Sequence, residues 1–166
     1  MGPFFIEAFR YHKWANLHLL AACADLTPEQ LRMTSPGTYG SMAATFLHLL
    51  GAEQRYIRRF SGAEVRISER DEFPGMAALR DIAERSADEL IQIAGRAQPD
   101  DQLDTIYDEK RYLLQAGVVL LQALHHGNDH RTHICTILGA HDIPYGDMDV
   151  WAYGNATGSM VLVDAS

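Results

Sequence analysis

Residues 114–138 read LQAGVVLLQALHHGNDHRTHICTIL, and this stretch decides the fold. We predict one long helix from about Leu114 to Leu138, with Gly139 as a typical residue to end it. Its first half, Gly117–Leu121, is apolar on every side, which predicts a deeply buried helix. Its second half is polar and rich in histidine, which is unusual for the centre of a small protein.

Three further segments show helical periodicity: Pro3–Ala24, Ser41–Phe60, and a third from about Pro74 to Gly95 or Arg96. Ser41 is a good N-cap for the second. The first carries an apolar stripe at spacings of three or four residues: Phe4, Ala8, Tyr11, Ala15, Leu19 and Ala22. Four helices of about 20 residues, joined by moderate connections, predict an all-α four-helix bundle.

Two segments fall outside this pattern. Leu103–Leu113 alternates less like a helix and allows a small β-hairpin around Asp108-Glu109-Lys110, before the last helix. The tail, residues 142–166, packs on the bundle or extends from it, and we expect Trp151 and Tyr153 to pin it there. With 166 residues and no long linker, we expect residues 1–166 to form a single domain.

The composition excludes several classes of function. A net charge of −8 without a large basic cluster argues against nucleic acid as a partner. No segment has the ~20 apolar residues of a membrane helix, and the N-terminus lacks the order of a signal peptide. Two cysteines, Cys23 and Cys135, suit a reducing compartment rather than a disulfide framework. We therefore expect a cytoplasmic protein without a membrane partner.

His126 and His130 are the most informative pair of residues. Residues four apart lie on the same side of a helix, one turn apart, so two imidazoles can reach one metal ion. The pair supplies two ligands, and a third must come from another helix. His48 is the best candidate, because its helical neighbours Ala44, Thr45, Gly51 and Ala52 are all small and leave an open concavity around it.

The other histidines have weaker claims. His133 shares the face of the pair but lies ~10 Å along the axis from His126, so we expect it to line the pocket. His12 neighbours the apolar stripe of its helix and is positioned to look into the site, whereas His18 is nearer the polar side. His125 points about 100° away from His126 around the helix, and His141 falls in a loop.

Four segments, in order, resemble the DinB-like (DinB/YfiT) family of small four-helix-bundle metalloenzymes. Tyr11-His12-Lys13-Trp14-Ala15-Asn16 is similar to the family's first helix, and His48 to its first ligand. His126-Gly127-Asn128-Asp129-His130-Arg131 resembles its His-x-x-x-His-Arg signature, and Asp147–Tyr153 its usual ending. One departure is Thr132-His133, where the family often has Gly-Gln. His133 is therefore expected to alter the pocket, and Arg131 to be structural.

The resemblance implies a three-histidine site formed by His48, His126 and His130, with zinc or nickel as the divalent ion and open positions for water. It also implies a small-molecule substrate, with a low-molecular-weight thiol as a candidate in a thiol-dependent S-transferase, and a homodimer. Two alternatives stay open. One is metal-assisted hydrolysis, although the glutamate of His-Glu-x-x-His proteases is missing and Asp129 points elsewhere. The other is a non-catalytic metal-binding protein of the stress response.

Overall fold

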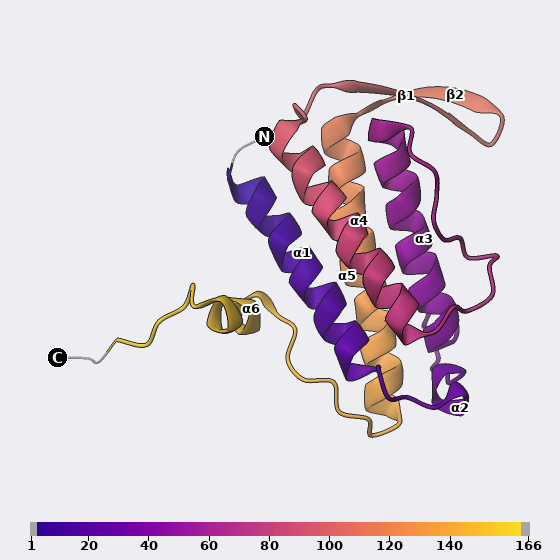
Figure 1. The fold of residues 1–166 in the computed structure, drawn as a ribbon, viewed down its shortest axis with the longest axis vertical. Coiled ribbons are helices and arrows are strands. Elements are labelled where there is room, and N and C mark those ends of the chain that lie inside the picture. Colours follow the sequence, from indigo (N-terminus) through magenta and orange to yellow (C-terminus); the bar gives the residue numbers. More distant parts are fainter. Residues whose placement is uncertain (1–2, 164–166) are drawn as a thin grey trace.

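Four long helices form the body of the protein in the computed structural model, which describes residues 3–163 (Figure 1). They are α1 (Pro3–Ala22), α3 (Met42–Ser61), α4 (Met76–Arg96) and α5 (Ala116–Ala140). Contacts between α1 and α4, α4 and α3, α3 and α5, and α5 and α1 close them into a ring. The predicted four-helix bundle is confirmed. Within the described residues, no helix is long and apolar enough to cross a membrane.

The helix ends follow local chemistry. Ser41 caps α3 as predicted, because its side chain accepts a hydrogen bond from the amide of Ala44 at 3.2 Å. Gly62 ends the same helix in the left-handed conformation, at a φ of 69°. The predicted end of α5 at Gly139 is slightly wrong, since the helix includes that glycine and is capped by His141. A short helix, α2 (Pro28–Leu31), begins at a capping box on Thr27.

The hairpin before the last helix is present. Strands β1 (Gln102–Tyr107) and β2 (Lys110–Gln115) pair antiparallel, from Gln102 opposite Gln115 to Tyr107 opposite Lys110. Asp108 and Glu109 make the turn with φ values of 50° and 59°, the left-handed backbone of a two-residue hairpin loop. The hairpin lies across one end of the bundle (Figure 1), and β1 contacts α3. Because β2 runs to Gln115, α5 begins two residues later than predicted.

The buried interior has two apolar halves with a polar layer between them. One half is centred on Leu19, Leu50 and Ile134, and the other on Phe9, Ile57 and Ala123. Between these positions along α1, α3 and α5 lie six buried polar residues, His12, Asn16, Glu53, Gln54, His130 and Arg131, of which His12, Asn16, Glu53 and Arg131 hydrogen-bond to one another and form the polar layer. The chain therefore places charged and polar groups at mid-height in its core, where each needs a partner.

Two predictions about burial are wrong. Val118 and Leu121 are each 57% exposed, so the apolar start of α5 is not buried on all sides. Phe4 is 93% exposed, because the core face of α1 runs instead through Phe9. Whether an apolar side chain is buried depends on whether a neighbouring helix covers its face, and the residue type alone does not predict this.

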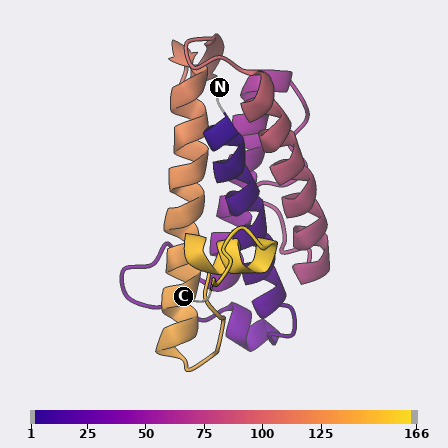
Figure 2. The same cartoon turned by 90° about the vertical axis from the view of Figure 1, so that its left-hand side faces the viewer.

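The tail is pinned by one of its two predicted anchors. Figure 2 shows α6 (Val150–Thr157) lying across α1. Tyr153 is buried and donates a hydrogen bond to Glu7 at 2.5 Å, whereas Trp151 is 71% exposed and anchors nothing. Tyr11 adds a hydrogen bond from its hydroxyl to the carbonyl of Met148 at 3.0 Å.

Candidate metal centre

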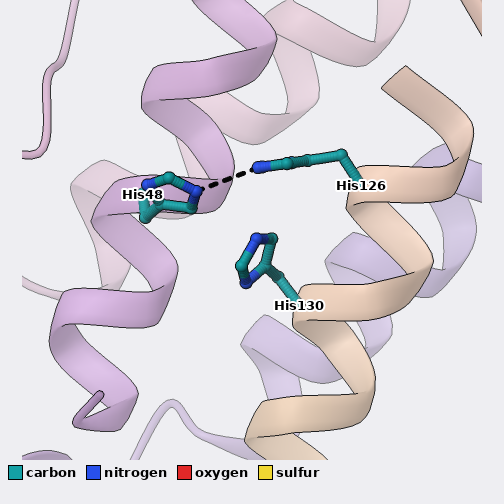
Figure 3. A group of neighbouring side chains, drawn as sticks. All are labelled: His48, His126 and His130. Atoms are coloured by element: carbon teal, nitrogen blue, oxygen red, sulfur yellow. Dashed lines mark hydrogen bonds between the residues drawn. The ribbon is translucent and has the colours of Figure 1, made fainter. Parts of the chain in front are cut away.

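The neighbouring helices α3 and α5 bring His48, His126 and His130 together (Figure 3). His126 and His130 lie one turn apart on α5, with ring centroids 4.3 Å apart, and His48 faces them from α3. One nitrogen from each ring lies within 4.8 Å of the other two. The Nε2 atoms of His48 and His126 are 3.0 Å apart. The structure thus gathers the predicted trio, while the binding of an ion by it stays a prediction.

Burial keeps two of these imidazoles neutral. Burial, with a smaller contribution from the neighbouring imidazoles, lowers the pKa of His126 to about 3 and that of His130 to about 4. Histidine binds metal only in its neutral form, so both are ready ligands at neutral pH. The Nδ1 atoms of both rings are buried and find no hydrogen-bond partner among residues 3–163. The convergence of three imidazole nitrogens within 4.8 Å of one another, two of them from neutral rings, fits a divalent ion such as zinc or nickel.

Glu69 orients His48 from outside the trio. Its Oε2 lies 2.5 Å from Nδ1 of His48, and this hydrogen bond is the main cause that lowers the pKa of Glu69. Because an ionised carboxylate only accepts hydrogen bonds, Nδ1 donates, and the lone pair of Nε2 faces the trio. Carboxylates commonly fix metal-ligating histidines in this way. Sequence reasoning missed Glu69, since it lies in an aperiodic connection with no spacing signal.

Gly51 explains how Glu69 comes so close. A Cβ atom at Gly51 would lie 3.3 Å from Cα of Ser68 and 3.4 Å from the amide nitrogen of Glu69. The small residue therefore lets the connection lie against α3. The expected open concavity around His48 is wrong at this point, because the backbone of that connection fills the space.

Two tyrosines enclose the trio. The ring of Tyr39 stacks on His48 with centroids 4.0 Å apart and meets His130 edge-on at 5.2 Å. Its hydroxyl donates a hydrogen bond to Glu69 at 3.2 Å, so one side chain contacts both a histidine and its carboxylate. Tyr56 meets His126 edge-on at 5.9 Å. Aromatic walls restrict how the imidazoles can turn, which keeps their nitrogens converging.

The remaining histidines fall outside the trio. His133 is half-buried, with its ring centroid 5.2 Å from that of His130, so it lies beside the trio, and its role in lining a pocket stays a prediction. His12 does not look into the site, because it belongs to the buried polar layer. His18 stacks on Trp14 with centroids 5.1 Å apart, and His125 and His141 are exposed.

The polar layer fastens α1 to α5 beside the trio. Glu53 receives hydrogen bonds from His12 at 2.7 Å and Asn16 at 2.9 Å, and Arg131 donates to Asn16 at 2.8 Å. Arg131 is thus structural, as predicted. Gly127 makes this contact possible, since a Cβ there would lie 2.2 Å from Cε1 of His12. The layer holds the stretch of α5 on which His126 and His130 lie.

Comparison with known proteins agrees with this architecture. The family model described as DinB family matches residues 1–141, which include all four bundle helices and the residue that caps α5, His141; the tail beyond it lies outside the match. No curated protein matches the sequence significantly.

Proposed function

The chain belongs to the DinB family, and from this premise we propose that it is a metal-dependent enzyme whose ion is held by His48, His126 and His130. One observation carries the proposal, the convergence of three imidazoles from two helices on one point. Three protein ligands leave at least one position open on a divalent ion, as in reactive rather than structural sites. Zinc and nickel are the ions that we propose, since both accept imidazole.

The reaction that we propose is transfer of a low-molecular-weight thiol to an electrophilic small molecule. When bound, a divalent ion supplies Lewis acidity that favours thiolate over thiol beside it. The sulfur forms a bond to an electrophilic carbon, the leaving group departs with the electrons of its own bond, and the thiol proton passes to solvent. The chain contributes the neutral imidazoles, the orientation of His48 by Glu69, and the aromatic wall of Tyr39.

Among the described residues, no uncommitted carboxylate base hydrogen-bonds to the trio, and this favours a thiol over water as the nucleophile. Among residues 3–163, Glu69 is the one carboxylate hydrogen-bonded to a member of the trio, and both His48 and Tyr39 already engage it. Asp129 is exposed. Water is a far weaker acid than a thiol, whose pKa is about 8.5, so it needs more help to ionise. Metal-assisted hydrolysis is therefore the second candidate, and a non-catalytic metal-binding protein the third.

A thiol-consumption assay tests the proposal. Metal-free protein, zinc- or nickel-loaded protein and the His126→Ala variant would each be incubated with cysteine and a chloronitroaromatic electrophile. We expect thioether formation above the uncatalysed rate with loaded protein alone. Equal rates in all three samples would contradict the S-transferase proposal and favour the binding protein. Turnover of an ester substrate by the loaded protein, without thioether, would favour the hydrolase.

The proposal extends to the state of the protein in the cell. We propose a homodimer, supported by the exposed apolar side chains of Val118 and Leu121 on α5. Sedimentation equilibrium that gives monomer alone would refute it. We also propose a cytoplasmic location, which suits the free thiols of Cys23 and Cys135, with no nucleic acid or membrane as partner.

A further inference from the structure

An arginine-rich groove lies at the hairpin end of α3. Its volume is about 660 Å³. Arg55, Arg58 and Arg59 line one wall, and the connection after α3 and strand β1 line the other through Gly62, Val65, Asp104, Thr105, Ile106 and Tyr107. A concentration of three guanidinium groups stands out in a chain whose net charge is −8.

The positive charge of this groove is not neutralised from within. Among residues 3–163, Arg58 and Arg59 have no carboxylate within ion-pair distance. The lining carboxylate, Asp104, is held by Arg111, whose Nε donates to both of its oxygens at 2.9 and 3.0 Å. The Nε atom of Arg59 is buried and finds no hydrogen-bond partner in the described chain. Arg59 also donates from Nη1 to the carbonyl of Arg55 at 2.9 Å. Attraction to the C-terminal end of α3 explains basic residues there, but not a guanidinium nitrogen that is buried without a partner.

The groove adjoins the candidate metal centre. His48, Arg55 and Arg59 are separated by seven and then four residues on α3, so they share one face of the helix. Nη1 of Arg55 lies 3.9 Å from Glu69, the partner of His48. Tyr56 contacts both the metal centre and the groove. Its ring meets His126 edge-on with centroids 5.9 Å apart, and the guanidinium carbon of Arg59 lies 5.8 Å from its ring centroid. From His48 to Arg59 the helix rises ~16 Å, the reach of an extended small molecule.

We propose that Arg55, Arg58 and Arg59 form a subsite for an anionic group, carboxylate or phosphate, of a molecule that reacts at the three-histidine centre. Planar guanidinium groups bind both kinds of oxyanion through paired hydrogen bonds. The subsite would select acidic substrates and hold their reactive end toward His48 and His126. That the anion belongs to a substrate rests on the proposed function, whereas the binding of an anion does not.

Anion binding to metal-free protein tests this subsite separately from catalysis. Inorganic phosphate and succinate would be titrated at low ionic strength, with the arginine Nε–Hε signals followed by NMR. We expect one or both anions to shift the signals of Arg58 and Arg59. Each of Arg58→Gln and Arg59→Gln should weaken binding by about tenfold, as loss of a charge-assisted hydrogen bond implies. Arg85→Gln, an equal charge change on the exposed face of α4, should leave the affinity unchanged.

The two anions distinguish the two classes of molecule that could supply the anionic group. Binding of phosphate alone would assign a phosphorylated molecule, and binding of succinate alone a carboxylic acid. No shift with either anion, or equal weakening by Arg85→Gln, would overturn the subsite even if the histidines bind metal. If the anions bind as expected and no thiol transfer is found, the subsite stands and the proposed reaction fails.

Discussion

Replacing Glu69 by alanine should weaken metal binding without removing a ligand. The carboxylate accepts a hydrogen bond of 2.5 Å from Nδ1 of His48, and its depressed pKa keeps it charged at neutral pH. Loss of such an outer partner typically costs 10–100-fold in metal affinity, or about 1.4–2.7 kcal/mol. Because the Glu69 side chain is 40% exposed, water partly replaces it, so we expect the lower end, roughly 10–30-fold.

A competition titration of zinc against a chromophoric chelator measures this loss. Glu69→Gln keeps an oxygen that can accept from His48 but removes the charge, so its affinity should fall between those of the wild type and Glu69→Ala. Glu72→Ala removes a carboxylate from the same connection and should bind as the wild type does. An unchanged affinity in Glu69→Ala, or an equal loss in Glu72→Ala, would refute the role given to this hydrogen bond.

Three further predictions concern stability. Gly127→Ala should destabilise the fold by about 2–3 kcal/mol in urea unfolding, since its Cβ would lie 2.2 Å from His12, and an unchanged midpoint would contradict the close contact. Metal-free protein should lose stability as the pH falls below about 6.5. In that range the histidines of the unfolded chain bind protons, whereas His126 and His130 of the folded chain, with pKa values of about 3 and 4, stay neutral. The loss should be smaller in variants that lack either imidazole, and an equal loss would reject this cause. Trp151→Ala should change the unfolding free energy by less than about 0.5 kcal/mol, because the side chain is 71% exposed. A larger loss of stability would show that Trp151 does hold the tail on the bundle.

The bundle and the trio could be predicted because both depend on helical periodicity. The spacing of His126 and His130 fixes their common face whatever the rest of the fold does. Ser41 marks the beginning of α3 through a hydrogen bond that involves only neighbouring residues. His48 does lie beside the pair, but the small residues around it do not leave a concavity as predicted, since the space near Gly51 is filled by the backbone of Ser68 and Glu69.

What could not be predicted depends on contacts between distant segments. Glu69 and Tyr39 come from connections without periodicity, so nothing in their local sequence ties them to His48. The exposure of Val118 is set by which face of α5 lacks a neighbouring helix, and composition does not carry that information. Likewise, the burial of His12 follows from its partners on other helices rather than from its own helix.

Metal content tests the central claim most directly. Tag-free protein, reconstituted with zinc or nickel and freed of excess ion, would be compared with His48→Ala, His126→Ala and His130→Ala, and with His125→Ala as an exposed histidine control, after circular dichroism has shown each to be folded. A three-histidine centre predicts about one ion per chain in the wild type and the control, and loss in each of the three variants. No bound ion in the wild type, or an ion retained when all three histidines are removed together, would contradict it.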